Sequence, residues 1–282
     1  MHEDLGRVLI LAGSDSGGGA GVQADIKTVT ALGGYAATAI TAITVQNTLG
    51  VLAVHPLSPD LVEAQARAVL DDIGADCLKT GMLGDAAMVE RVAAIIGAAG
   101  LPAVIDPVMV AKGGRSLLPD DAVEAVKRLL IPLATLLTPN TQEAQELTGI
   151  PVTNEAGQRR AGEALLALGA QAVLMKCGHI EGDRVVDLLI TPASTTRFES
   201  GRIVSRNTHG TGCTLASGIA TGLAQGLGLE RSVGRARDYL IEAIKRAPHF
   251  GSGHGPVDHG WPMRPGGRER LLDGSQLPKG RA

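Results

Sequence analysis

Aromatic residues are nearly absent from this sequence. Its 282 residues include two Phe, two Tyr and one Trp, too few for the series of stacked rings on which single-stranded nucleic acids bind. An excess of positive charge is missing too, because 26 Lys and Arg residues stand against 29 Asp and Glu residues, for a formal net charge of −3. Such a chain has no field that collects backbone phosphates. We therefore expect no nucleic-acid partner.

Cysteine and long apolar runs are scarce as well. Cys77, Cys177 and Cys213 form an odd set without the spacing of a metal site. No apolar run reaches the length that spans a membrane. The apolar stretch VLILA near the start is shorter than the hydrophobic segment of a signal peptide. These absences predict a cytoplasmic protein with no membrane partner.

Short apolar segments alternate along the chain with amphipathic helical patterns. RVLILAG, PAVIDPVM and QAVLMKCG are examples of the apolar segments. Most are apolar at both odd and even positions, which is typical of strands covered on both faces. The helical patterns fall near residues 21–33, 58–73, 85–99, 119–130, 141–149, 154–168, 210–227 and 230–246. This alternation predicts an α/β fold with a mostly parallel sheet between two helical layers.

The domain organisation follows from the same pattern. No linker interrupts the alternation, so we expect one domain over residues 5–262. Residues 263–282 are polar and rich in Gly, Pro and Arg, and we expect them to form a flexible tail.

The segment HGTGCTLASGIATGL begins a helix with glycines and small hydroxyl residues. Free N–H groups and the positive dipole end at such a position bind anions, and Gly210 and Gly212 allow close approach of the backbone. An ordinary glycine-rich helix start is the alternative. Cys213, which follows directly, is either a thiol whose thiolate the helix N-terminus favours or a small packed hydrophobe.

Three other strand ends carry charged or amide side chains. Lys176 either reaches a phosphate or extends its ammonium to water. Asn140 and Glu143 are oxygen ligands of the kind that Mg²⁺ takes beside nucleotide phosphates. A glutamate in a first helical turn, here after Thr141 as the expected N-cap, also simply offsets the helix dipole. Asp106 faces the phosphate or metal site, or else accepts hydrogen bonds from its own loop.

The glycine tract SDSGGGAG at residues 14–21 resembles two known phosphate-binding loops, and neither fits. GAGVQA matches the dinucleotide fingerprint, but a five-residue spacer separates it from the strand end near Gly13, and the second strand carries no acidic residue for a ribose. A Walker A loop is excluded because G-K-[ST] does not occur.

The remaining interpretation is a site for a small polar molecule that approaches the glycine backbone. We expect the following helix to bury Val22, Ile26 and Val29, with Asp25 beside that face as a hydrogen-bond acceptor for the molecule. Gln46, at the end of the next strand, supplies an amide with both donor and acceptor, although a turn role is as common.

In combination these motifs resemble the hydroxymethylpyrimidine and phosphomethylpyrimidine kinases of thiamine biosynthesis, in the ribokinase-like superfamily. The resemblance runs from about residue 7 to 261 and rests on AGSDSGGGAGVQADIKT, TAITVQNTLGV, KTGML, VIDPVMVAKGG, LLTPNTQEAQELTG, VLMKCGH and NTHGTGCTLASGIA. It implies a ribokinase-like three-layer α/β/α sandwich. The implied activity is phosphorylation of 4-amino-5-hydroxymethyl-2-methylpyrimidine to its monophosphate and then to the diphosphate, by a homodimer that uses ATP and Mg²⁺.

The resemblance also implies roles for individual residues. The residues that would bind the pyrimidine are Gln46, Asp25, Gly13, Met82 and Val108. Those that would contact ATP are Lys176, Asn140 and Thr208. The residues that would hold Mg²⁺ are Glu143 and Asp106, with Asn140 beside them. The catalytic group would be Lys176 with the anion hole formed by Gly210, Thr211, Gly212 and Cys213.

The chain departs from related patterns at two cysteines. Sugar kinases of the superfamily have Asp, a general base, where this chain has Cys213. Phosphoryl transfer through a loose transition state depends mainly on positioning and charge neutralisation, and an Asp would repel a phosphate acceptor. We therefore hypothesise that Cys213 is a near-neutral wall that admits both an alcohol and a phosphate monoester. KCGH stands where many relatives have KGGH, and we expect a mild effect of Cys177.

Two alternative functions remain open from the sequence. A pyridoxal kinase shares this scaffold and a cysteine at the position of Cys213. A non-catalytic nucleotide- or pyrimidine-binding regulator is the alternative from another class. His249, His254 and His259 recur every five residues, but loop histidines without zinc spacing are more often structural, and we assign them no metal.

Overall fold

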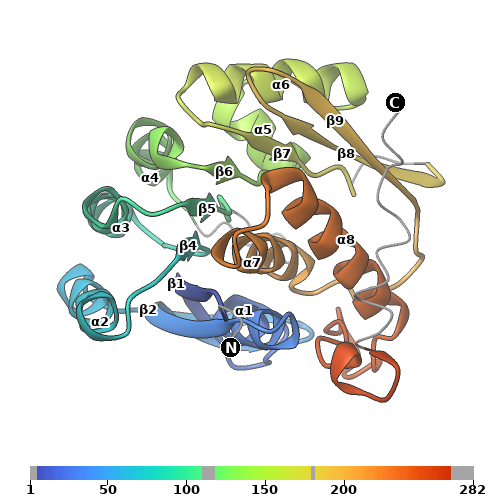
Figure 1. Ribbon diagram of the computed structural model, residues 1–282, viewed down its shortest axis with the longest axis horizontal. Coiled ribbons are helices and arrows are strands. Elements are labelled where there is room, and N and C mark those ends of the chain that lie inside the picture. The colour runs from blue at the N-terminus through green and yellow to red at the C-terminus, as the bar shows by residue number, and fades with distance from the viewer. Residues whose placement is uncertain (1–4, 110–117, 179–181, 268–282) are drawn as a thin grey trace.

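A central sheet of nine strands organises the computed structural model, which describes residues 5–109, 118–178 and 182–267 (Figure 1). Its strands are β1 (Arg7–Asp15), β2 (Tyr35–Asn47), β3 (Gly50–Pro56), β4 (Cys77–Thr80), β5 (Ala103–Ile105), β6 (Leu136–Leu137), β7 (Val173–Met175), β8 (Arg184–Ile190) and β9 (Thr195–Gly201). They are ordered β3-β2-β1-β4-β5-β6-β7-β8-β9. Neighbours from β2 to β7 pair in parallel, and β3, β8 and β9 pair antiparallel at the two edges. The mostly parallel sheet is confirmed.

The helices lie close to the predicted ranges. They are α1 (Gly21–Ala31), α2 (Pro59–Asp72), α3 (Ala86–Ala99), α4 (Asp120–Ala125), α5 (Thr141–Thr148), α6 (Glu155–Ala167), α7 (Thr211–Ala224) and α8 (Leu229–Lys245). A π-helical turn (Val126–Leu130) and a 3-10 turn (Ile131–Leu133) extend α4, and a further 3-10 turn follows at Trp261–Met263. The predicted helix at 119–130 is thus α4 together with its π-helical extension.

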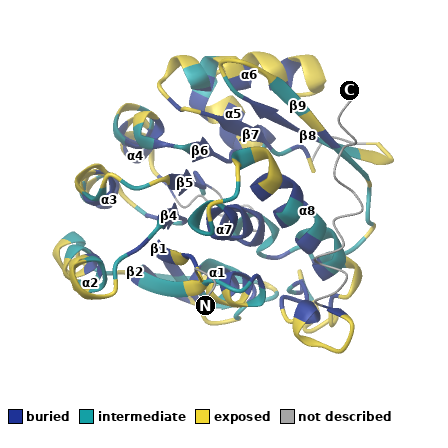
Figure 2. Cartoon of the chain, in the orientation of Figure 1, coloured by how far each residue is buried: buried dark blue, intermediate teal, exposed yellow. Residues whose placement is uncertain are grey.

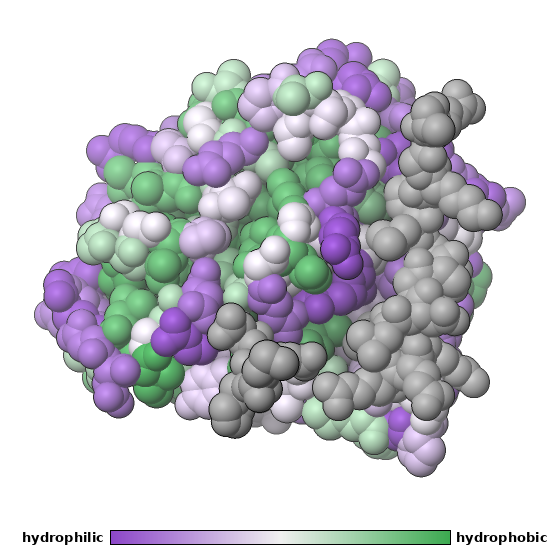
Figure 3. Space-filling view, viewed as in Figure 1, coloured by the Kyte–Doolittle hydropathy of each residue, from purple (hydrophilic) through white to green (hydrophobic). Residues whose placement is uncertain are grey.

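Strand β1 shows why the sheet is covered on both faces. Leu9 and Leu11 belong to the apolar cluster that α2, α3 and α6 share, whereas Val8, Ile10 and Ala12 belong to the cluster beneath α1, α7 and α8. Successive side chains of a strand point to opposite faces, so one apolar run supplies both cores. Figure 2 shows the central strands β4 to β7 buried and the outer sides of α2, α3 and α6 exposed. In Figure 3, hydrophilic side chains cover much of the visible outer surface, with apolar patches between them.

The buried face of α1 differs from the predicted one. Ile26 is 40% exposed, whereas Asp25 is completely buried between Val22 and Val29. The helix packs against β1 and α7 with the stripe 22, 25, 28 and 29, which has the i, i+3, i+7 spacing of a helical face. The prediction for Ile26 is therefore wrong, because a buried partner lets a carboxylate occupy the centre of this face.

The last described residues pack against α8. Trp261 is buried and donates from Nε1 to the carbonyl of Tyr239 at 3.1 Å. Arg264 lies 2.6 Å from a carboxylate oxygen of Asp258. Of the tail predicted at 263–282, residues 268–282 lie outside the described residues, and its flexibility stays a prediction. No helix within the described ranges has both the length and the apolarity needed to cross a membrane.

The burial of His259 predicts that the stability of the fold depends on pH. It is buried, and its Nε2 lies 3.0 Å from Oγ1 of Thr214. Burial, together with charges at Lys27 and His209, lowers its pKa from 6.5 to about 4. The unfolded chain then binds the proton more tightly, so stability is lost as the pH falls from 6.5 towards 4. We expect the free energy of unfolding to drop by about 2 kcal/mol from this residue between pH 7.5 and 5.

Urea unfolding at both pH values checks this expectation. The variant His259→Gln should lose most of that pH dependence, whereas His55→Gln, at an exposed position, should keep it. A His259→Gln protein with the full wild-type pH dependence would contradict the assignment.

Candidate active site

A cavity of about 870 Å³ lies at the carboxyl ends of the parallel strands. Every site residue predicted from the sequence lines it except Asp25. Those lining residues are Gly13, Gln46, Met82, Asp106, Val108, Asn140, Glu143, Lys176, Thr208, Gly210, Thr211, Gly212 and Cys213. The cavity continues along β9 and α8, past residues for which the sequence analysis predicted no role.

The ammonium group of Lys176 lies close to the N-terminus of α7. A Cβ atom added at Gly212 would be 3.4 Å from Nζ of Lys176 and 3.6 Å from Oδ2 of Asp106. The N-cap of α7 is Gly210, with φ of +79°, and no side chain caps this end. The first N–H groups of an uncapped helix have no partner within the helix. A cation and free backbone donors therefore face the same space, as an anion site requires.

Asp106 neutralises this positive site. Its Oδ1 accepts from Nζ of Lys176 at 2.8 Å and from Oγ1 of Thr138 at 3.0 Å. Burial opposes ionisation, but Lys176 and Lys79 hold the pKa of Asp106 below its usual value. Burial likewise opposes the charge on Lys176, and Asp106 with Glu143 keeps the pKa of Lys176 above its usual value. The pair is therefore ionic at neutral pH.

Asn140 and Glu143 form a capping box at the start of α5. Oδ1 of Asn140 accepts from the backbone N–H groups of Gln142 at 2.9 Å and Glu143 at 3.0 Å, and Oε2 of Glu143 accepts from the Asn140 N–H at 2.7 Å. Asn140 is the N-cap, so the prediction that Thr141 caps this helix is wrong. Because both lone pairs of the Asn140 oxygen are used, this oxygen is poorly suited to a metal ion.

The remaining oxygen donors can be compared with what Mg²⁺ needs. Burial raises the pKa of Glu143 to about 7, and the negative charge of Asp106 adds to this rise. Among the described residues, no group of three or more His, Cys, Asp or Glu side chains is placed to hold a metal. Mg²⁺ usually binds one or two carboxylates together with waters and substrate phosphates. Asp106 and Glu143 fit such a partial site beside a phosphate.

Asp25 does not contact the cavity. Both of its oxygens accept from Nζ of Lys79 at 2.9 Å, and Oδ1 accepts from Oγ of Ser217 at 2.6 Å. Asp25 and Lys79 are both fully buried, so the prediction that Asp25 binds the substrate is wrong. The sequence did contain a signal, because Lys79 lies within the short apolar strand CLKT and a buried charge needs a partner.

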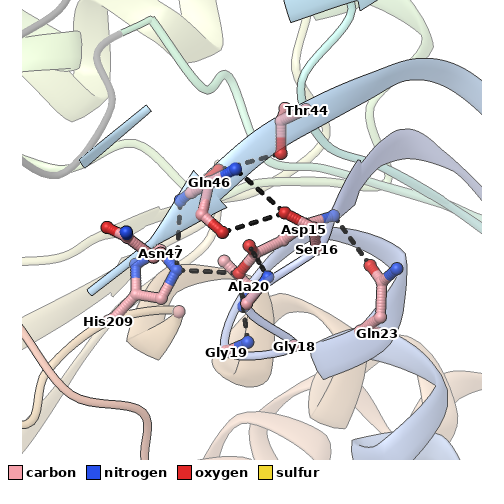
Figure 4. Close-up of polar contacts among 12 residues, drawn as sticks. Asp15, Ser16, Gly18, Gly19, Ala20, Gln23, Thr44, Gln46, Asn47 and His209 are labelled. Carbon is pink, nitrogen blue, oxygen red and sulfur yellow. Dashed lines mark hydrogen bonds and ion pairs between the residues drawn. The ribbon is translucent and has the colours of Figure 1, made fainter. Parts of the chain in front are cut away.

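Asp15 organises the glycine loop, and the sequence analysis missed it (Figure 4). It accepts from the backbone N–H groups of Gly17 at 2.8 Å, Gly19 at 3.0 Å and Ala20 at 2.8 Å, and it lies 2.8 Å from Nε2 of His209. Burial opposes ionisation, but these contacts lower the pKa of Asp15 overall. The available signal was an Asp two residues before a glycine run, since Asp side chains bond to nearby backbone in turns.

Glycine residues let the two glycine-rich loops pack against each other. A Cβ at Gly19 would lie 2.6 Å from Cδ2 of His209, and a Cβ at Gly210 would lie 1.8 Å from the carbonyl oxygen of Gly19. Part of the glycine content therefore serves contact within the chain, in addition to the predicted approach of a small molecule.

Burial favours the neutral thiol form of the two cysteines near the site. Burial raises the pKa of Cys213 to about 11 and that of Cys177 to about 12. This rise, with burial as its main cause, favours the small packed side chain over the thiolate interpretation of Cys213. The side chain of Cys177 contacts Nε2 of Gln158, whereas its N–H donates to Asp187 at 2.9 Å.

Comparison with known proteins places this geometry in a family. The family model described as phosphomethylpyrimidine kinase matches residues 15–258. The chain belongs to this family.

Two proteins that are similar to this chain in sequence are named for thiamine biosynthesis or for pyrimidine kinase activity. The thiamine biosynthesis bifunctional protein ThiED of Geobacter sulfurreducens is 50% identical over 255 residues, which cover 90% of this chain and 52% of that protein. The chain thus spans about half the length of that relative. The hydroxymethylpyrimidine/phosphomethylpyrimidine kinase of Streptomyces coelicolor is 48% identical over 256 residues, covering 91% of this chain and 95% of the relative.

Solved structures with the same fold include a pyridoxal kinase and a phosphomethylpyrimidine kinase. The pyridoxal kinase of Bacillus subtilis, in an ADP complex, has a TM-score of 0.85 at 35% identity and covers 91% of this chain and 98% of its own. The phosphomethylpyrimidine kinase of Clostridium difficile has a TM-score of 0.76 at 40% identity, with coverage of 84% and 99%. The ribokinase-like three-layer fold is confirmed.

The close contact at Gly210 leads to a stability prediction. Gly210 and Gly226 have nearly the same φ, +79° and +77°, but a Cβ at Gly226 would meet no atom within 4 Å. The variant Gly226→Ala should cost about 1–2 kcal/mol from the left-handed backbone alone. Gly210→Ala should cost at least about 2 kcal/mol more, because it pushes the two loops apart. Urea unfolding of both variants measures the difference, and equal losses would show that the loops do not need this contact.

Proposed function

We propose that this protein transfers the terminal phosphoryl group of ATP to 4-amino-5-hydroxymethyl-2-methylpyrimidine and then to the resulting monophosphate, in thiamine biosynthesis. The observation that carries the proposal is the convergence of the Lys176 ammonium and the uncapped N-terminus of α7 on one cavity. The membership in the phosphomethylpyrimidine kinase family and the names of the relatives support it.

The acceptor end of the cavity would lie beside Gly13, Gln46, Met82 and Val108. Met82 and Val108 are apolar, and Gln46 is the amide among these four. A small heterocycle with polar ring edges suits such a pocket, since a few placed polar groups among apolar walls fix a ligand's orientation. Cys213 lines the same cavity as a neutral thiol, so it would repel neither an alcohol nor a phosphate.

The nucleotide end would lie along β9 and α8. Ile203, Leu240, Ile241 and Ile244 line this part of the cavity and would form apolar walls for an adenine ring. The related pyridoxal kinase solved with ADP supports a nucleotide in this fold. We place the ATP phosphates at Lys176, Thr208 and Asn140, of which Lys176 supplies the positive charge.

Catalysis would rest on positioning and on charge neutralisation. Transfer through a loose transition state places charge on the equatorial oxygens of the migrating group, and the Lys176 ammonium with the N–H groups of Gly210 to Cys213 would stabilise that charge. Mg²⁺ bound with the nucleotide would be held by Asp106 and Glu143 and would supply further neutralisation. In that state the phosphate would pair with Lys176 and Mg²⁺ with Asp106, in place of the ion pair that these two residues form with each other.

We also propose that two copies associate through the β2–β3 edge of the sheet. Ile43, Val45, Leu49 and Leu52 are exposed there, and β3 is an edge strand. Exposed apolar residues on an edge strand are typical of a protein interface. We further expect a cytoplasmic location, as the composition suggests.

Pyridoxal phosphorylation is the second candidate function. It is favoured by the structural likeness to Bacillus subtilis pyridoxal kinase, whose TM-score is above that of the Clostridium difficile phosphomethylpyrimidine kinase. The identities rank the two in the opposite order, so the acceptor has to be tested directly.

Product analysis after incubation with MgATP, the pyrimidine alcohol and pyridoxal together tests the proposal. We expect the pyrimidine monophosphate and diphosphate to dominate. The variant Lys176→Ala should turn over about 10² to 10³ times more slowly, because one preorganised cation is removed from the transition state. Lys127→Ala, which removes a lysine outside the cavity, should keep its rate. Formation of pyridoxal phosphate alone, or an unimpaired Lys176→Ala variant, would refute the proposal.

The hypothesis that Cys213 is a neutral wall makes a separate prediction. The variant Cys213→Asp should lose more kcat/KM with the monophosphate than with the alcohol, by about tenfold or more, because two like charges a few ångströms apart repel by about 1–4 kcal/mol. The neutral variant Cys213→Ser serves as the matched control and should affect both acceptors alike. Equal losses with both acceptors in Cys213→Asp would contradict the hypothesis.

A further inference from the structure

Gln46 lies beside a buried Asp15–His209 pair (Figure 4), and all three residues line the cavity. Asp15 is 3% exposed and His209 8% exposed. The two residues stand 194 positions apart in the chain and meet only because the glycine loop packs against the segment before α7. Neither residue belongs to the groups assigned above to phosphoryl transfer.

The contact with Asp15 determines which His209 nitrogen carries a proton. Nε2 of His209 lies 2.8 Å from Oδ2 of Asp15. That carboxylate also accepts from the backbone N–H groups of Gly19 and Ala20 through the same oxygen, which favours its ionised form. A bare lone pair on Nε2 would face a negative oxygen. Nε2 therefore carries a proton, whether or not Nδ1 is protonated.

This proton in turn determines how the Gln46 amide is oriented. With the amide nitrogen of Gln46 3.2 Å from Nε2 of His209, two hydrogen-bond donors would face each other. The amide oxygen would then lie 3.1 Å from Oγ1 of Thr44, which donates its single proton to the carbonyl of Ser14 at 2.9 Å, so two acceptors would face each other. Turning the amide over removes both conflicts, and the two amide atoms are distinguished only by their hydrogen bonds.

In the turned orientation every group has a suitable partner. The Nε2–H of His209 donates to the Gln46 oxygen as well as to Asp15. The Gln46 NH₂ donates to Thr44, which donates to Ser14. One N–H and one oxygen lone pair of the amide remain free for a ligand.

We infer that Asp15 and His209 are positioning residues that lock the Gln46 amide in one orientation and thereby make the cavity selective for a 4-aminopyrimidine edge over a 4-oxopyrimidine edge. This inference rests on the proposed function, in which Gln46 contacts the acceptor. A free amide can turn over and pair with either edge. A locked amide pairs with an amino donor beside a ring acceptor, and it meets the reversed pattern of the 4-oxo ring with donors and acceptors mismatched.

The fold holds the imidazole in place for this task. Gly19 leaves room for the ring, since a Cβ there would lie 2.6 Å from Cδ2 of His209. The backbone N–H of His209 donates to the carbonyl of Gly255 at 3.1 Å. The backbone of His209 is thus anchored, and the contact with Asp15 holds its ring beside Gln46.

Steady-state kinetics with two acceptors test the inference. We would measure kcat/KM for 4-amino-5-hydroxymethyl-2-methylpyrimidine and for its 4-oxo counterpart with the wild type, His209→Leu and His209→Gln. The amino-to-oxo ratio should fall at least tenfold in His209→Leu, mainly through KM of the pyrimidine, while KM for ATP is unchanged. His209→Gln restores an N–H donor and should recover the ratio to within about threefold of the wild type. His55→Leu is the matched control and should not change the ratio.

The outcomes separate this inference from the proposed function. A folded His209→Leu variant with the wild-type ratio overturns the inference alone, as does an active wild type that does not discriminate between the acceptors. A wild type that phosphorylates neither pyrimidine overturns the proposed function and this inference with it.

A measurement on the wild type covers the case in which His209→Leu does not fold. The ¹⁵N NMR spectrum of histidine-labelled protein, with His209 assigned from the His209→Gln spectrum, should show a protonated Nε2 across the neutral pH range. An unprotonated Nε2 overturns the inference.

Discussion

The approach of the Lys176 ammonium to the uncapped start of α7 is the constraint on which the site depends. Two positive features would repel each other across this short distance, and Asp106 makes their proximity stable by pairing with Lys176. A phosphate in the proposed reaction would take over part of that role. The Lys176 ammonium would then be paired in both the ligand-free and the phosphate-bound state, which keeps it preorganised for transfer.

Behind this contact lies a row of buried ionisable side chains in which acidic residues alternate with lysines. Asp25, Lys79, Asp106, Lys176 and Glu143 influence one another's ionisation in sequence. Charges removed from water are tolerated when each has a partner. The ion pair of Asp25 with Lys79 contacts no cavity, yet it lies between α1, β4 and α7, whose ends carry the site. Removal of a single member would leave an unpaired buried charge beneath the active centre.

Much of the fold and most of the candidate site could be predicted because periodicity is a local property. The helical ranges were nearly correct, and strand ends of a parallel sheet meet at one edge, which brought Asp106, Asn140 and Lys176 together. Strand β9 was not predicted, because TTRFESG buries only Phe198 and has the polar pattern of a loop. Ile26 and Asp25 exchanged their expected environments because the periodicity of α1 alone cannot identify a distant partner such as Lys79.

The sequence by itself determined the alternation of strands and helices, the glycine positions of the two loops and the residues at the carboxyl edge of the sheet. These features follow from side-chain chemistry over a few neighbouring positions. Only the tertiary structure decided which partner each buried polar group takes, because those partners are far apart in the chain: Lys79 is 54 residues from Asp25, and His209 is 194 residues from Asp15. A hydrogen bond forms over about 3 Å in space, a distance that spacing along the chain does not encode.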